Sequence, residues 1–205
     1  MVARGDLGIE IPAEEVPLYQ KILVKKANEA RKPIIIATQM MESMIDNLTP
    51  SRAEVNDVAN SVMDGADCIM LSGETSVGKY PCEVVKKVGS IIASVEDSQP
   101  VQNKFSIPKL KSNRILTKTV CRHAALIANE IKASAICTLT FSGYTGWQIS
   151  SWRPNSLVLV FTSNKRILSQ LNLLWGVKCI YYNKFLSTDR TVEDVNLLAL
   201  KNRFV

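Results

Sequence analysis

The sequence has few of the residues and patterns that define several common protein classes. It contains 205 residues, of which 9 are glycine, 8 are proline and only one, His123, is histidine. The low glycine and proline content excludes collagen-like and low-complexity chains. A catalytic triad or a histidine-based metal site would have to be built on His123 alone, which lies within an expected helix. No apolar run reaches the ~18 residues of a membrane span, so we expect no membrane partner.

The five cysteines also lack the arrangement of a disulfide framework. Their number is odd, they are far apart, and no two of them form a CxxC pair; they are Cys68, Cys82, Cys121, Cys137 and Cys179. This pattern argues against both paired disulfides and a zinc site. We therefore expect free thiols in a reducing compartment, and a cytoplasmic protein. Apolar residues make up 46% of the chain and charged residues 21%, as in ordinary globular proteins.

Charge is distributed unevenly along the chain. Residues 1–97 hold 10 Lys and Arg against 15 Asp and Glu, whereas residues 98–205 hold 15 against 4. The basic half could attract phosphorylated metabolites, nucleic acid or an acidic protein, but without an RNA-binding aromatic motif or zinc finger we expect no nucleic-acid partner. Residues 98–112 are polar, contain two prolines and show no helical period. The sequence therefore predicts domains at 1–97 and 113–205 joined by a linker at 98–112.

Helices and strands alternate in the first half. Apolar residues at helical spacing predict a helix over 16–30, and Ser51 with Glu54 forms the pattern of a capping box for a helix that ends before Gly65. Another helix is expected after Pro81. Apolar, β-branched runs at 33–38 and 67–72 are typical of buried parallel strands. This repetition predicts a parallel sheet or barrel.

The second half alternates in the same way and predicts a small α/β domain with helices on both faces of its sheet. The expected helices lie near 114–132, 145–152, 165–173 and after Arg190, and the expected strands at 135–140, 156–162 and 177–181. The first half holds only about three βα units, and it starts on the end of a strand. Because a closed barrel needs eight such units, we expect a large N-terminal part in the whole protein.

Two strand ends in the first half carry candidate ligand-binding residues. Gly5 and Asp6 follow the first strand directly, where a glycine turn brings backbone amides close to a carboxylate or phosphate. Asp6 offers hard oxygen atoms suited to Mg²⁺. Thr38 lies at the carboxyl end of the strand at 33–38, the end where βα proteins gather their chemistry. Its hydroxyl could bind an anionic substrate or relay a proton through water.

Two further segments resemble phosphate-binding loops. Residues 73–80 read GETSVGKY, which is nearly the P-loop pattern, but Tyr80 replaces the Mg²⁺-binding Ser or Thr and Glu74 places a negative charge in the would-be phosphate site. In the basic half, Thr140-Phe141-Ser142-Gly143-Tyr144-Thr145 joins a strand to a helix. Its hydroxyls, its glycine and the helix start are the parts of an anion site, although a plain helix cap fits as well.

Taken together, these motifs resemble those of one family. The segments MVARGDLGIEIP, KPIIIATQMMESMI, PSRAEVNDVANSVMDGADCIMLSGETSVGKYP and the later SGYT…RP are similar in order and spacing to pyruvate kinase. The similarity is dense over 1–97 and continues to about residue 182. It implies an α/β fold made of the last βα units of a TIM (β/α)8 barrel, followed by a small α/β C-terminal domain that is truncated in this chain.

The resemblance implies phosphoryl transfer from phosphoenolpyruvate to ADP, giving pyruvate and ATP with Mg²⁺ and K⁺ as cofactors. It assigns Asp6 to Mg²⁺, the amides of Gly5 and Asp6 to the substrate carboxylate, and Thr38 to a substrate contact. A possible effector-phosphate site corresponds to Thr140, Ser142, Gly143 and Thr145, although Phe141 and Tyr144 are bulky for a sugar bisphosphate. The family's catalytic lysine, second Mg²⁺-binding carboxylate, K⁺ ligands and most nucleotide contacts have no counterpart in this sequence.

The resemblance therefore predicts that the 205-residue chain is inactive and poorly soluble by itself. Family members are homotetramers, so we also expect a homo-oligomer. Three alternatives remain from the residues themselves: a non-catalytic module that binds a phosphorylated metabolite through the basic domain, an assembly module, and a P-loop nucleotide hydrolase that uses residues 73–79.

Overall fold

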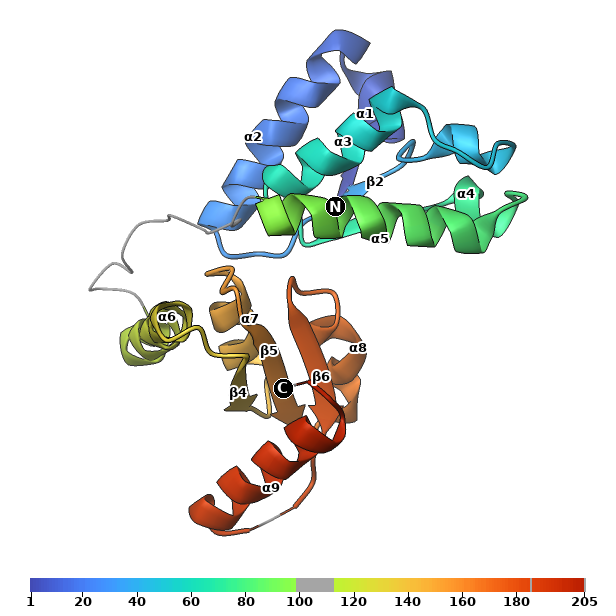
Figure 1. Cartoon of the computed structure of the whole chain (residues 1–205). Coiled ribbons are helices and arrows are strands. Elements are labelled where there is room, and N and C mark those ends of the chain that lie inside the picture. Colours follow the sequence, from blue (N-terminus) through green and yellow to red (C-terminus); the bar gives the residue numbers. More distant parts are fainter. Residues whose placement is uncertain (99–112, 185, 205) are drawn as a thin grey trace. The chain divides into compact units, whose positions relative to one another are not determined.

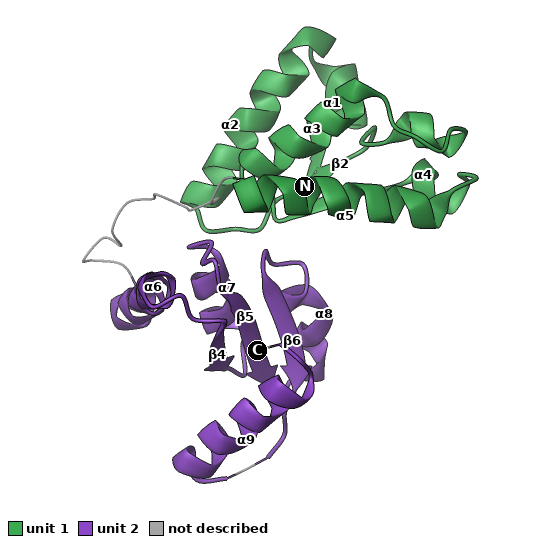
Figure 2. Ribbon diagram, viewed as in Figure 1, with its two compact units in different colours: residues 1–101 green, residues 102–205 purple. Residues whose placement is uncertain are grey.

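The computed structural model describes residues 1–98, 113–184 and 186–204 and consists of two compact units, 1–101 and 102–205 (Figure 2). Apart from Ser98, the predicted linker lies outside the described residues. The predicted domain bounds, 1–97 and 113–205, therefore remain a proposal. Within the described part of the chain, every helix is too short or too polar to cross a bilayer.

The first unit is built on a sheet of three short parallel strands. They lie in chain order, β1 (Val2–Ala3), β2 (Ile35–Ala37, labelled in Figure 1) and β3 (Cys68–Met70), with Val2 opposite Ile36 and Ile36 opposite Ile69. The helices are α1 (Arg4–Glu10), α2 (Val16–Glu29), α3 (Arg52–Met63), α4 (Gly73–Ser76) and α5 (Pro81–Ser98), with 3-10 turns at Ala13–Glu15 and Glu42–Ile45. Neighbouring parallel strands joined through helices are the repeating unit of a βα barrel.

Local sequence signals explain the bounds of α3. The Ser51 hydroxyl accepts a hydrogen bond from the Glu54 amide at 3.3 Å, and the Glu54 carboxylate accepts one from the Ser51 amide at 2.7 Å. This capping box satisfies amides that the first helical turn leaves unpaired. Gly65, just beyond the helix, has φ +95°, as expected for a left-handed helix end. Both predictions are confirmed.

The first unit's core lies between its sheet and helices. Fully buried Ile36, Met40, Val58 and Val84 come from β2, the segment after it, α3 and α5. Two expectations were wrong here. Strand β3 is half-buried along its length rather than buried, and residues 4–10 form a helix rather than an open turn.

The second unit is a three-stranded parallel sheet with helices on both faces, as predicted. Its strands β4 (Ala135–Leu139), β5 (Leu157–Thr162) and β6 (Val177–Tyr181) also follow chain order. Its helices are α6 (Ile115–Glu130), α7 (Tyr144–Ser150), α8 (Leu168–Leu171) and α9 (Thr188–Lys201). The single helix expected over 165–173 is instead a 3-10 turn, Lys165–Ile167, followed by the short α8.

Alternate residues of the central strand β5 divide the second unit's core in two. Val158 and Val160 are buried in a cluster with residues of α6, α7 and α8. Leu159 and Phe161 point to the other face and pack in a cluster with Val195 and other residues of α9. The period-2 alternation of a strand therefore places one helical layer on each side of the sheet.

Candidate functional site

Three loops meet at the carboxyl edge of the first unit's sheet. They are the start of α1 after β1, residues 38–41 after β2, and residues 72–74 after β3. Because the strands are parallel, their carboxyl ends lie along the same edge. The sequence placed its candidate substrate-binding residues on the first two of these loops.

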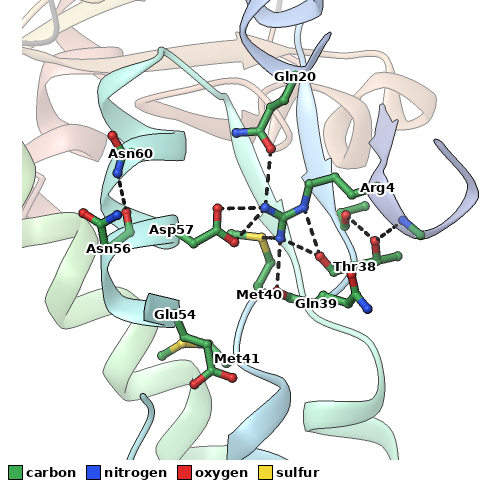
Figure 3. Close-up of polar contacts among 12 residues, drawn as sticks. Arg4, Gln20, Thr38, Gln39, Met40, Met41, Glu54, Asn56, Asp57 and Asn60 are labelled. Atoms are coloured by element: carbon green, nitrogen blue, oxygen red, sulfur yellow. Dashed lines mark hydrogen bonds and ion pairs between the residues drawn. The ribbon is translucent and has the colours of Figure 1, made fainter. Parts of the chain in front are cut away.

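The structure brings Gly5 together with Thr38, which Figure 3 labels. The Gly5 amide donates a hydrogen bond to Thr38 Oγ1 at 2.9 Å, and that hydroxyl donates to the carbonyl oxygen of Ala37 at 2.6 Å. Thr38 and the following Gln39 both have left-handed backbones, with φ of +70° and +53°. A β-branched residue rarely adopts this conformation, and such backbone strain gathers at functional sites.

Asp6 lies beside this pair in the first turn of α1, with an exposed side chain. A carboxylate is favoured there because the first amides of a helix are not paired within it. Within the described residues, the Asp6 carboxylate forms no ion pair. Its exposed carboxylate therefore fits a hard cation such as Mg²⁺. In the described ranges, no three His, Cys, Asp or Glu side chains lie together in a group that could hold a metal ion.

Arg4 is a component of the site that our sequence analysis missed. Its Nη1 contacts both carboxylate oxygens of Asp57 in α3 at 2.7 Å, and its Nη2 donates to the carbonyl oxygens of Thr38 at 2.7 Å and Gln39 at 3.1 Å (Figure 3). The Arg4 side chain is only 11% exposed. The sequence offers one indication of a role for Arg4, which is its position directly after a strand. Nothing in the sequence links Arg4 to Asp57, which is 53 residues away.

Glu74 is the second missed residue, because its charge was interpreted only against a P-loop. The side chain is buried and its carboxylate accepts hydrogen bonds from the amides of Met41 at 3.1 Å and Ser72 at 2.7 Å. Burial alone would raise the pKa of Glu74, but hydrogen bonds from backbone amides, including those of Ser72 and Met41, lower it below 4.5 overall. Glu74 therefore ties the loop after β2 to the loop after β3.

The geometry of residues 73–80 argues against a P-loop. Residues 73–76 are themselves helical, and Glu74 turns into the core rather than lining a phosphate site. The exposed Lys79 pairs with Asp46 at 2.9 Å. A Walker-type site needs an open glycine-rich loop whose amides and lysine converge on phosphates.

A cavity of about 460 Å³ opens next to the site. Its lining includes Arg4, Gly5, Gly8, Gln39 and Asp57. Gly5 and Gln39 therefore border a space that could admit a small ligand, whereas Asp6 and Thr38 are not among its lining residues.

The candidate effector residues of the second unit lie in the segment between β4 and α7 and in the first turn of α7. Thr140 Oγ1 accepts the Gly143 amide at 3.0 Å, and Thr145 Oγ1 lies 2.8 Å from Thr138 Oγ1. Ser142 is exposed, and Gly143 has φ +80° at the start of α7. Of the four, only Thr140 lines the cavity of about 290 Å³ at the carboxyl edge of β4, β5 and β6.

Comparisons with known proteins match both units to one family. A family model described as the pyruvate kinase barrel domain matches residues 1–85, and one described as the pyruvate kinase alpha/beta domain matches residues 118–205. The chain is 42% identical over its whole length to a pyruvate kinase of Sporosarcina psychrophila, and 45% identical over 86% of its length to one of Geobacillus stearothermophilus. It spans 35% and 30% of those relatives, about a third of their length.

A solved structure agrees with the sequence comparisons. The crystal structure of a pyruvate kinase from Cryptosporidium parvum superposes with a TM-score of 0.88 at 33% identity, over 99% of this chain and 41% of the other. These features define the class of proteins that have a (β/α)8 barrel, here present in part, followed by an α/β domain. The chain belongs to the pyruvate kinase family.

Proposed function

We propose that this chain supplies the carboxylate- and metal-binding part of an active site that transfers the phosphoryl group of phosphoenolpyruvate to ADP, giving pyruvate and ATP in the cytoplasm. The observation that supports it is the cluster of Gly5, Asp6 and Thr38 at the carboxyl edge of the barrel strands. Phosphoryl transfer depends mainly on positioning and charge neutralisation. Oriented amides beside a carboxylate suit both tasks.

Each residue takes a separate role in this proposal. The amides of Gly5 and Asp6 bind the substrate carboxylate, and the Asp6 carboxylate holds Mg²⁺, which neutralises charge on the transferring group. The Gly5 amide donates to Thr38 Oγ1 in this structure. A substrate carboxylate would replace that oxygen as acceptor and leave the Thr38 hydroxyl next to the substrate. We assign no residue of this chain to K⁺ or to the catalytic lysine role.

Substitutions in the native-length protein test the assignment. Asp6→Asn and Thr38→Val should each lower kcat/KM for phosphoenolpyruvate by about 100-fold or more, the usual effect of removing one well-placed electrostatic group. Asp46→Asn is the matched control, since Asp46 is exposed and pairs with Lys79, away from the site. Asp6→Asn should also raise the Mg²⁺ concentration needed for half-maximal rate. Unchanged kinetics in both variants would remove Gly5, Asp6 and Thr38 from the site.

We also propose that the isolated 205-residue chain does not catalyse the reaction. Among the described residues we assign Asp6 alone to the metal, and within them no lysine of the site neutralises the transferring phosphoryl group. A coupled assay of the purified chain with phosphoenolpyruvate, ADP, Mg²⁺ and K⁺ should give no pyruvate above background. Turnover that disappears in Asp6→Asn would contradict this proposal directly.

A phosphate-binding role for Thr140, Ser142, Gly143 and Thr145 remains a second, weaker proposal. Ser142 is exposed, whereas the hydroxyls of Thr140 and Thr145 are hydrogen-bonded to the Gly143 amide and to Thr138. Thermal-shift titration with sugar phosphates tests it: stabilisation that persists in Asp6→Ala and is lost in Ser142→Ala would support the site. No shift with any sugar phosphate would exclude it.

A further inference from the structure

The starting observation is that two consecutive residues hold Thr38 from two sides. The Gly5 amide binds the Thr38 side chain at 2.9 Å, while the Arg4 guanidinium binds the Thr38 carbonyl through Nη2 at 2.7 Å and Nε at 3.3 Å (Figure 3). Nη2 also reaches the Gln39 carbonyl at 3.1 Å. The left-handed turn at Thr38 and Gln39 is therefore held at both of its carbonyl oxygens by Arg4 and at the Thr38 hydroxyl by the Gly5 amide.

The guanidinium is itself fixed by the surrounding helices. Both oxygens of Asp57 in α3 lie 2.7 Å from Nη1, and Gln20 Oε1 in α2 lies 3.4 Å from the same nitrogen. The side chains of Arg4 and Asp57 are 11% and 31% exposed. A planar guanidinium presents its donors in a rigid fork, which a lysine ammonium does not reproduce. One side chain thus joins two helices to a strained turn.

Two adjacent non-glycine residues with positive φ persist only where the surroundings hold them. The carbonyl oxygens of Thr38 and Gln39 both accept hydrogen bonds from Arg4. Hydrogen bonds from a charged donor are stronger than neutral ones, and this donor is itself held in place. Without the fork, these residues would relax toward ordinary backbone angles. The Thr38 hydroxyl would then leave the Gly5 amide.

We propose that Arg4, held by Asp57, is a positioning residue that keeps the Thr38–Gln39 turn left-handed and so keeps the Thr38 hydroxyl beside the Gly5 amide, where it would contact a substrate carboxylate that takes its place as acceptor. The catalytic consequence rests on the proposed function, whereas the structural consequence does not. Arg4 touches no substrate in this account. It acts on the reaction only through the turn.

Kinetics of Arg4→Lys and Asp57→Asn in the native-length protein test the catalytic consequence. Arg4→Lys should lower kcat/KM for phosphoenolpyruvate by about 10- to 100-fold through a higher KM, since a misplacement of about 1 Å in a positioned group can cost about 100-fold. The KM for ADP should stay unchanged. A merely structural role would instead reduce the folded fraction, which lowers kcat and leaves both KM values alone. Asp57→Asn, which keeps one oxygen acceptor, should fall between Arg4→Lys and wild type.

The matched control is the ion pair between Lys21 of α2 and Asp64 at the end of α3, 2.6 Å apart. It links the same two helices and contacts none of the site residues. Lys21→Ala should leave both KM values within twofold of wild type. If Lys21→Ala and Arg4→Lys have the same kinetic effect, Arg4 is only a structural tie and the proposal is wrong.

Hydrogen exchange of the Gly5 amide gives a readout that needs no activity. Arg4→Lys should speed this exchange by roughly tenfold or more, because the amide loses its acceptor when the turn opens, and Lys21→Ala should not change it. If wild type makes no pyruvate, the proposed function fails while this measurement still decides the role of Arg4. Unchanged Gly5 exchange in both Arg4→Lys and Asp57→Asn would overturn the inference.

Discussion

Glu74 shows at the residue scale how a buried charge is tolerated. Its carboxylate accepts backbone amides from the two loops that follow β2 and β3. Glu74→Gln keeps the shape but turns an amide NH₂ toward these donors, so we expect a loss of about 1–3 kcal/mol at pH 7. Chemical denaturation of the variant and wild type measures it. Glu83→Gln is the control, because Glu83 lies at an exposed position of α5. This change should lower the free energy of unfolding by less than half as much.

The lowered pKa of Glu74 also predicts how this loss varies with pH. The folded protein holds the carboxyl below its ordinary pKa of 4.5, so its contribution is complete above about pH 4.5 and fades as pH falls through the folded pKa. The stability gap between wild type and Glu74→Gln should therefore be constant from pH 7 to 5 and narrow below pH 4.5. A gap that widens as the solution is acidified would contradict the assigned role of the carboxylate.

The residues of the candidate site differ in how far the sequence reveals them. Gly5, Asp6 and Thr38 were predicted because each stands directly after a strand, and the structure places Gly5 against Thr38 with Asp6 adjacent. Arg4 was missed because its partner is 53 residues away, beyond any local pattern. Glu74 was recognised as unsuited to a phosphate site, but its amide partners on a neighbouring loop could not be foreseen from the sequence.

At the scale of elements, the start of α3 offers a clean test of capping. Ser51 forms a complete capping box with Glu54, whereas Ser187, also the N-cap of a helix, makes no side-chain capping bond to α9. Ser51→Ala should destabilise the first unit by about 1 kcal/mol, and Ser187→Ala should change the second unit much less. Chemical denaturation, monitored by hydrogen exchange of the amides in each unit, measures both changes in stability. Equal losses of stability in the two variants would mean that the intrinsic preference of serine for the N-cap position, and not its hydrogen bonds, determines the change.

Most elements were predictable because their signals are local, and the exceptions have a physical cause. Strand β6 matches its prediction residue for residue, since an apolar run is bounded there by turn residues. Residues 165–173 carry helical spacing but form only a 3-10 turn and one turn of helix. Residues 4–10 contain two glycines, which favoured an open turn, yet they are helical. Tertiary contacts, such as the Gly5–Thr38 hydrogen bond, outweigh weak propensity in such short segments.

At the scale of the whole molecule, the surface of α6 bears on assembly. Four large apolar side chains lie along α6 and its C-terminal cap, and the three on the helix lie about 20° or less from a common line. They are Leu116, Val120, Ile127 and Ile131, exposed by 80%, 67%, 52% and 69%. Exposed apolar side chains gathered on one side of a helix mark an interaction surface more often than free solvent-facing helix. The exposed His123 interrupts this group between Val120 and Ile127. The family resemblance implies a homotetramer, so we propose a second copy of the chain as the occupant.

This proposal predicts a concentration-dependent mass for the purified protein. Val120→Lys combined with Ile127→Lys should shift the mass measured by light scattering and sedimentation toward a single chain, because charges placed in an apolar contact must lose their hydration when it forms. Both side chains are exposed, so the changes should leave the unit folded. Val77→Lys, at a 76% exposed position of the first unit, is the control and should leave the mass unchanged. A wild-type protein that stays a single chain at all concentrations would rule out self-association through α6.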